Sequence, residues 1–207
     1  GLLVAFVLYI PRKLMRFQDF MTGIVDGIKT MIAPLLILVF AWALSGVCRE
    51  MLGTGQFVSQ FVSAIQLPME FLPALVFVIA AFLSFATGTA WGTFGILLPI
   101  VMMIGMTPEG ELILIPALGA TLAGSVYGDH CSPISDTTIL SSTGAQCVHL
   151  RHVETQMPYA TLVAAVCVVG YIIAGFTQNA WITLAASILL LLVCLVVLWL
   201  KQKKVKS

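Results

Sequence analysis

The sequence predicts an all-α polytopic membrane protein, and both its composition and the spacing of its charges indicate this class. Hydrophobic residues make up 60% of the chain, charged residues only 9%, and the mean hydropathy is +1.07. Soluble domains carry about 25% charged residues, and a soluble core cannot absorb this much apolar surface. Charged residues are absent from segments 30–48, 71–108, 112–128 and 155–200. A helix needs roughly 20 apolar residues to cross a hydrocarbon core, so these segments have membrane dimensions.

The N-terminal part predicts three elements before the first polar stretch. Residues 1–10 are expected to be the end of a spanning helix, and residues 17–29 have the apolar spacing of a short amphipathic helix at the membrane surface. Residues 30–48 predict a full span, whereas residues 51–70 are too polar to predict one. Because the chain begins with apolar residues and without Met, we expect residues 1–207 to form a single transmembrane transport domain, an N-terminally truncated portion of a longer transporter.

Segment 71–108 is uncharged but is interrupted by Gly and Thr residues at 86–95. The apolar stretch on each side of this interruption is too short for a full span. A re-entrant hairpin with its tip at membrane depth fits these lengths, and two crossings joined by a polar turn are the alternative. At such a tip, freed carbonyls and hydroxyls would contact a cation. The candidate residues are Thr87, Gly88, Thr89 and Thr93.

The C-terminal part predicts three further helices. Residues 111–128 carry small residues at four-residue spacing, which lets helix backbones approach closely. The last apolar run divides at Gln178 into two spans, 157–177 and 180–200, and residues 149–154 are expected to form a charged cytoplasmic loop. Basic residues gather near the start and at the end of the chain, so the positive-inside rule places both clusters, and the C-terminus, in the cytoplasm.

The segment that follows residue 128 predicts a broken helix. It is rich in carboxylates and hydroxyls and contains Gly128 and Pro133. We expect a helix to end near Gly128, an unwound stretch to follow, and a half-helix to begin with Ser132 as its N-cap and Pro133 as its first residue. Asp136 would then lie in the first turn of that half-helix.

Broken helices near the bilayer midplane form ion sites in many secondary transporters. Freed carbonyls, hydroxyls and carboxylates are hard oxygen ligands that suit small hard cations, and a carboxylate inside a membrane is costly unless it has a function. A solvated loop in which Ser132 only caps a helix is the alternative interpretation. The candidate cation- and proton-binding residues are Asp136, Asp129, Ser132, Ser135, Thr137 and Thr138.

Two motifs resemble a known family. Residues 128–138, GDHCSPISDTT, resemble the GDxxSPxSDTT signature of the NhaC-type sodium/proton antiporters, and residues 87–93, TGTAWGT, resemble that family's TGTSWGT segment. Ala90 stands where the family often has Ser, so one hydroxyl is lacking. The resemblance covers about residues 20–176. It implies an ion-transporter-type bundle with a re-entrant hairpin and a broken helix, which together form one half of an inverted repeat.

The resemblance implies a secondary transporter, not an enzyme, that exchanges Na⁺ for H⁺ by alternating access in the bacterial cytoplasmic (inner) membrane. Na⁺ would bind at Asp136 and Asp129, with Na⁺ and H⁺ as the transported ions and no cofactor. The expected partners are the lipid bilayer and the missing N-terminal half of the same protein, with no nucleic acid; a homodimer is open. The alternatives are a sodium-coupled organic-acid (carboxylate) exchanger on the same scaffold, a passive channel and an intramembrane hydrolase.

Overall fold

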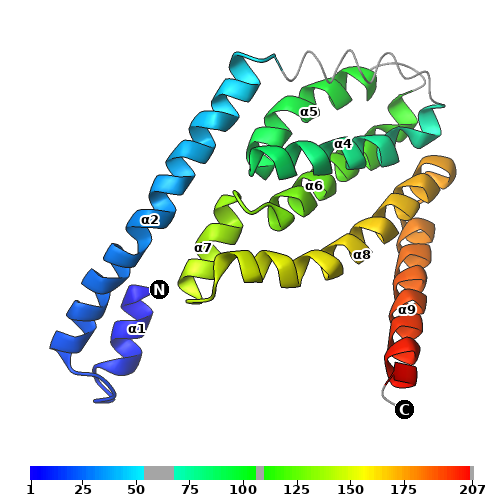
Figure 1. The fold of residues 1–207 in the computed structure, drawn as a ribbon. Coiled ribbons are helices and arrows are strands. Elements are labelled where there is room, and N and C mark those ends of the chain that lie inside the picture. The colour runs from blue at the N-terminus through cyan, green and yellow to red at the C-terminus, as the bar shows by residue number, and fades with distance from the viewer. Residues whose placement is uncertain (54–67, 106–109, 206–207) are drawn as a thin grey trace.

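The computed structural model describes residues 1–53, 68–105 and 110–205, and every regular element in these ranges is helical (Figure 1). Among the residues that the structure describes, four helical segments are long and apolar enough to cross a membrane: Met69–Thr87, Glu111–Cys131, His149–Thr177 and Ala180–Lys201. The prediction of a polytopic α-helical membrane protein is therefore confirmed. The predicted polar stretch at 51–70 lies mostly outside the described residues.

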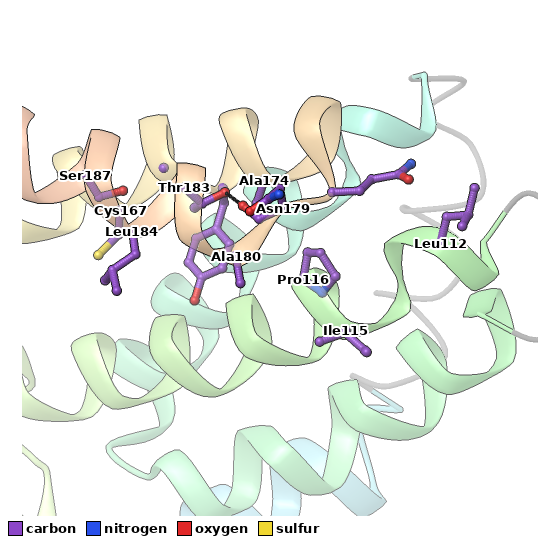
Figure 2. A pocket seen from close by; sticks show the side chains of 13 residues that line it. Leu112, Ile115, Pro116, Cys167, Ala174, Asn179, Ala180, Thr183, Leu184 and Ser187 are labelled. Carbon is purple, nitrogen blue, oxygen red and sulfur yellow. Dashed lines mark hydrogen bonds between the residues drawn. The ribbon is translucent and has the colours of Figure 1, made fainter.

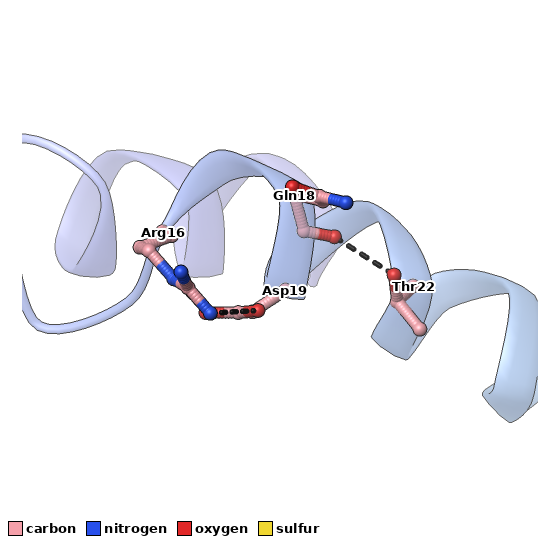
Figure 3. A network of polar contacts seen from close by, with 4 residues as sticks. All are labelled: Arg16, Gln18, Asp19 and Thr22. Atoms are coloured by element: carbon pink, nitrogen blue, oxygen red, sulfur yellow. Dashed lines mark hydrogen bonds and ion pairs between the residues drawn. The ribbon is translucent and has the colours of Figure 1, made fainter.

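The N-terminal part consists of α1 (Leu2–Tyr9) and the long helix α2 (Phe17–Glu50). Arg16 precedes α2 and forms two hydrogen bonds to the carboxylate of Asp19 in its first turn, at 2.9 and 3.2 Å (Figure 3). The prediction of a separate surface helix at 17–29 is wrong, because α2 continues without interruption through 34 residues. Thr30, where the predicted full span begins, lies inside α2, and its hydroxyl donates to the carbonyl of Gly27 in the preceding turn of the same helix.

A helical hairpin follows, formed by α4 (Leu72–Thr87) and α5 (Ala90–Gly105), with the short 3-10 helix η1 (Met69–Phe71) before it. Only Gly88 and Thr89 lie between the two helices, so the predicted ten-residue interruption at 86–95 is wrong in extent. The hydroxyls of Thr87 and Thr93 donate to carbonyls four residues earlier in the chain, so both are bonded to the backbone of the preceding turn.

Helix α6 (Leu114–Cys131), preceded by η2 (Glu111–Ile113), packs along α4. The small residues predicted to permit close approach do so: a Cβ atom at Gly124 would collide with the carbonyl oxygen of Phe77, and one at Gly128 with that of Ala81. The two backbones are therefore in direct contact, as the spacing of small residues indicates. One apolar cluster fills the space between α4 and α5. A second lies between α4, α6 and the helix α8 (His149–Thr177).

The remaining helices are α7 (Asp136–Gly144), α8 (His149–Thr177) and α9 (Ala180–Val205). Residues 149–154, predicted to be a loop, form the first turns of α8. The break between α8 and α9 is where it was predicted: Gln178 adopts a left-handed conformation, and the Asn179 side chain accepts hydrogen bonds from the first amides of α9. In Figure 1, α8 runs back beneath α6, and α9 turns away from its end.

Candidate functional site: a carboxylate and hydroxyl cluster at a helix break

The helix break lies between Cys131, where α6 ends, and Asp136, where α7 begins. Ser132 is extended, with φ −77° and ψ 129°, as expected for a residue that precedes proline. Ser135 is also extended, and its hydroxyl accepts a hydrogen bond from the Thr138 amide at 3.5 Å. The predicted N-cap at Ser132 is therefore wrong by three residues, and α6 ends three residues later than expected. The prediction that Asp136 lies in the first turn of the half-helix is confirmed.

Asp129 is the buried centre of a hydrogen-bonded cluster that also includes the exposed residue Thr137. Its side chain lies in the last turns of α6, and the residue is only 4% exposed. One carboxylate oxygen, Oδ1, accepts a hydrogen bond from the Ser135 hydroxyl at 2.8 Å, and Oδ2 accepts one from the Thr137 hydroxyl at 2.9 Å. Hydrogen bonds to a charged group contribute about 1.5–3 kcal/mol each, so this pair binds the start of α7 to the end of α6.

The cluster of Asp129, Ser135 and Thr137 is short of one proton when the carboxylate is charged. The two hydroxyl oxygens are also 2.9 Å apart. Three contacts then join three side chains, but each hydroxyl has only one proton and donates it to Asp129. Lone pairs of Ser135 and Thr137 therefore face one another. A proton on Asp129, or a cation against the two hydroxyl oxygens, would remove this repulsion.

Asp136 lies beside this cluster and is partly buried. The Asp129 carboxylate is close enough for the two charges to repel, and the side chain of Trp42 on α2 lies near Asp136. No local signal could have found this contact, because it depends on α2 packing against α7.

The tip of the α4–α5 hairpin meets the helix break directly. Gly88 has φ +68°, and a Cβ atom there would lie 2.7 Å from the carbonyl oxygen of Ile134. The Ser132 hydroxyl donates a hydrogen bond to the carbonyl of Phe85 at 2.8 Å, which fastens the break to the last turn of α4. The structure thus brings together the two segments that the sequence singled out.

The individual hydroxyls of the hairpin are engaged within their own segment. Thr87 donates to Leu83, Thr93 donates to the carbonyl of Thr89, and the Thr89 hydroxyl accepts from Gly92. Within the described part of the chain, no hydrogen bond joins these threonines to either carboxylate. In the break, the Thr138 hydroxyl donates to the carbonyl of His130 at 3.3 Å. Gly88 is thus the hairpin residue that the structure places against the break.

The larger of the described cavities lies elsewhere. It has a volume of about 510 Å³ and lies between α6, α8 and α9, lined by residues such as Pro116, Tyr171 and Asn179 (Figure 2). None of the predicted cation-binding residues lines it. Its walls are mainly apolar, and its polar side chains, such as Asn179, Thr183 and Ser187, include no carboxylate.

Comparison with known proteins supports the interpretation of the two motifs. The model of the Na⁺/H⁺ antiporter family matches residues 1–176. The chain belongs to this family. An uncharacterized protein of Haemophilus influenzae is 44% identical over 193 residues, which are 93% of this chain and 37% of that protein. Together with the apolar helices, membership of the family makes the chain part of an integral membrane protein.

Other antiporter-family relatives carry functional names. The malate-2H⁺/Na⁺-lactate antiporter of Bacillus subtilis is 31% identical over 77% of this chain and 33% of its own length. The Na⁺/H⁺ antiporter NhaC of the same organism is 27% identical over 76% of this chain and 34% of its own length. The chain therefore spans about a third of the length of these relatives. No solved structure matches it. The names of these two relatives describe them as antiporters.

Proposed function

We propose that this chain carries the cation site of a transporter that exchanges Na⁺ for H⁺ across a bacterial cytoplasmic membrane by alternating access. The observation that carries the proposal is the hydrogen-bonded ring of Asp129, Ser135 and Thr137 beside Asp136. Two carboxylates and two hydroxyls are hard oxygen ligands, and such ligands suit Na⁺. Membership of the Na⁺/H⁺ antiporter family supports Na⁺ and H⁺ as the two exchanged ions.

Competition between the two ions follows from this arrangement. Two neighbouring carboxylates in a partly dehydrated site cannot both be charged without repulsion. A proton relieves that repulsion, and so does a Na⁺ ion, but the two occupants exclude one another. Asp136 is the leading site, because the positive end of α7 favours its charged form and because it is less buried than Asp129. Asp129 supports it by holding Ser135 and Thr137 in place.

The remaining site residues have supporting roles in this proposal. Ser132 fastens the break to α4, and Thr138 fastens α7 to the end of α6. Backbone carbonyls near Gly88 complete the shell of the cation, while Thr87, Thr89 and Thr93 hold the hairpin tip in its helical form.

A re-entrant hairpin is part of the proposal. Each of α4 and α5 has 16 residues. At 1.5 Å per residue α5 is about 24 Å long, which is shorter than a hydrocarbon core of about 30 Å, whereas α4 together with η1 is long enough to cross one. A hairpin of this length that turns back at the helix break would bring its tip to membrane depth. We further propose that this unit is one half of an inverted repeat within a longer transporter, with the C-terminal basic residues in the cytoplasm.

The direct test is Na⁺/H⁺ exchange driven by a pH gradient in everted vesicles that contain the full-length protein. Asp136→Asn is expected to abolish exchange. Asp129→Asn is expected to raise the Na⁺ concentration for half-maximal exchange about tenfold, the equivalent of one charge-assisted hydrogen bond. Asp26→Asn is the matched control, since Asp26 is exposed and pairs with Lys29 on α2. Exchange at the wild-type level in Asp136→Asn would contradict the assignment.

A second candidate is a sodium-coupled organic-acid exchanger on the same scaffold. The specific observation in its favour is the 31% identity to the malate-2H⁺/Na⁺-lactate antiporter. Such an exchanger needs a contact for the solute's carboxylate, and segments 71–108 and 155–200 contain no Lys or Arg. Sodium flux that requires malate or lactate on one side of the membrane would favour this candidate, and sodium flux without either would favour simple Na⁺/H⁺ exchange.

A further inference from the structure

His149 connects three segments around the helix break. It is the first residue of α8 and is partly buried. One ring nitrogen, Nε2, lies 2.7 Å from the carbonyl oxygen of Pro133 in the unwound stretch, and the other, Nδ1, lies 3.0 Å from the hydroxyl oxygen of Ser142 in α7. Sequence reasoning placed this residue in a charged loop. His149 and Pro133 are 16 positions apart in the chain, and no local pattern in the sequence indicates their contact.

The hydrogen-bond chemistry determines which nitrogen of His149 carries a proton. The carbonyl of Pro133 can only accept, so Nε2 must be the donor. In the neutral ring, the Ser142 hydroxyl then donates to Nδ1. In the charged ring, Nδ1 donates to Ser142, whose proton is free to bind the carbonyl of Ile139 at 3.0 Å. The bond from Nε2 to Pro133 is present in both forms.

The Pro133 carbonyl lies within the stretch that sets the geometry of the cation site. Ser135, two residues later, caps α7 and donates to Asp129, and α7 begins at Asp136. A shift of the backbone at Pro133 would move the Ser135 hydroxyl away from the carboxylate. The hydrogen bond from His149 holds this stretch against the start of α8.

We infer that His149 is a positioning residue that holds the unwound stretch 132–135 in the conformation required for cation binding. It does not contact the cation and acts through the carbonyl of Pro133. The part of the inference that concerns cation affinity rests on the proposed function. The part that concerns the order of the backbone does not.

The test compares His149→Gln with His149→Asn in the full-length protein. The amide nitrogen of Gln reaches the place of Nε2 and keeps the bond to Pro133, whereas the shorter Asn reaches only the place of Nδ1. His152→Asn, one turn further along α8, is the matched control. Two quantities are measured for each variant: the rate of amide hydrogen exchange in residues 134–138 relative to residues 117–128 of α6, and the Na⁺ concentration for half-maximal exchange in vesicles.

We expect His149→Asn to accelerate amide exchange in residues 134–138, but not in α6, and to raise the half-maximal Na⁺ concentration about fivefold with a smaller change in maximal rate. His149→Gln and His152→Asn should resemble the wild type in both measurements. Equal behaviour of the Gln and Asn variants, or unchanged amide exchange in His149→Asn, would overturn the inference. If the wild type itself exchanges no Na⁺, the proposed function fails, while the amide measurement still decides whether His149 orders the break.

Discussion

Replacing Gly88 with alanine is expected to separate the hairpin tip from the helix break. The new Cβ atom would lie 2.7 Å from the carbonyl oxygen of Ile134 and 2.9 Å from its carbonyl carbon, closer than Cβ atoms pack in proteins. Because both contacts are with backbone, a side-chain rotation cannot relieve them. Alanine must also adopt φ +68°, a left-handed conformation that costs about 1–2 kcal/mol.

The two effects add to a substantial destabilisation. Forcing an extra methyl group into a packed interface typically costs about 1–3 kcal/mol. When the cost of the left-handed conformation is added, Gly88→Ala should lower the free energy of unfolding by roughly 2–5 kcal/mol. The same movement would carry the carbonyls near residue 88 away from the site, so the Na⁺ concentration for half-maximal exchange should also rise.

The assay is unfolding of the purified protein in detergent, together with Na⁺/H⁺ exchange in vesicles. Gly95→Ala is the matched control in the same hairpin, since a Cβ atom there meets nothing within 4 Å and alanine favours a helix over glycine. Gly88→Asn separates the two causes, because asparagine tolerates the left-handed conformation but still collides with Ile134. If Gly88→Ala unfolds and transports like Gly95→Ala, the tip does not contact the break as described.

Two further substitutions test the packing and the cluster. Gly128→Ala should destabilise the protein by about 1–3 kcal/mol in thermal unfolding, since its Cβ atom would collide with the backbone of α4, whereas Gly119→Ala should be tolerated because its nearest neighbour would be 3.7 Å away. Ser135→Ala removes both a donor to Asp129 and the cap of α7, so we expect a loss of about 2–4 kcal/mol in stability and weaker Na⁺ dependence of exchange. Ser141→Ala, at an exposed position of α7, should match the wild type in stability and in Na⁺ dependence. Equal effects of Ser135→Ala and Ser141→Ala would contradict the role of Ser135 in the cluster.

The sequence predicted the positions of the break and the hairpin but not their boundaries. Runs of apolar residues, glycine and proline are local signals, so they located the turn near Gly88 and the interruption near Pro133. Helix ends depend instead on which partner each polar group finds. Helices α4 and α5 include Thr87 and Thr93, whose hydroxyls donate to carbonyls one turn earlier, and Ser135 rather than Ser132 caps α7.

By itself, the sequence determined that this is an integral membrane protein, where its C-terminal helices divide, and that Asp136 lies in the first turn of a half-helix. These properties follow from hydropathy and from backbone preferences, which act over a few neighbouring residues. Only the tertiary structure decided which groups meet: Asp129 with Ser135 and Thr137, Gly88 with Ile134, and His149 with Pro133. Such contacts depend on how helices pack, and two short polar segments with the same composition could lie far apart in a different bundle.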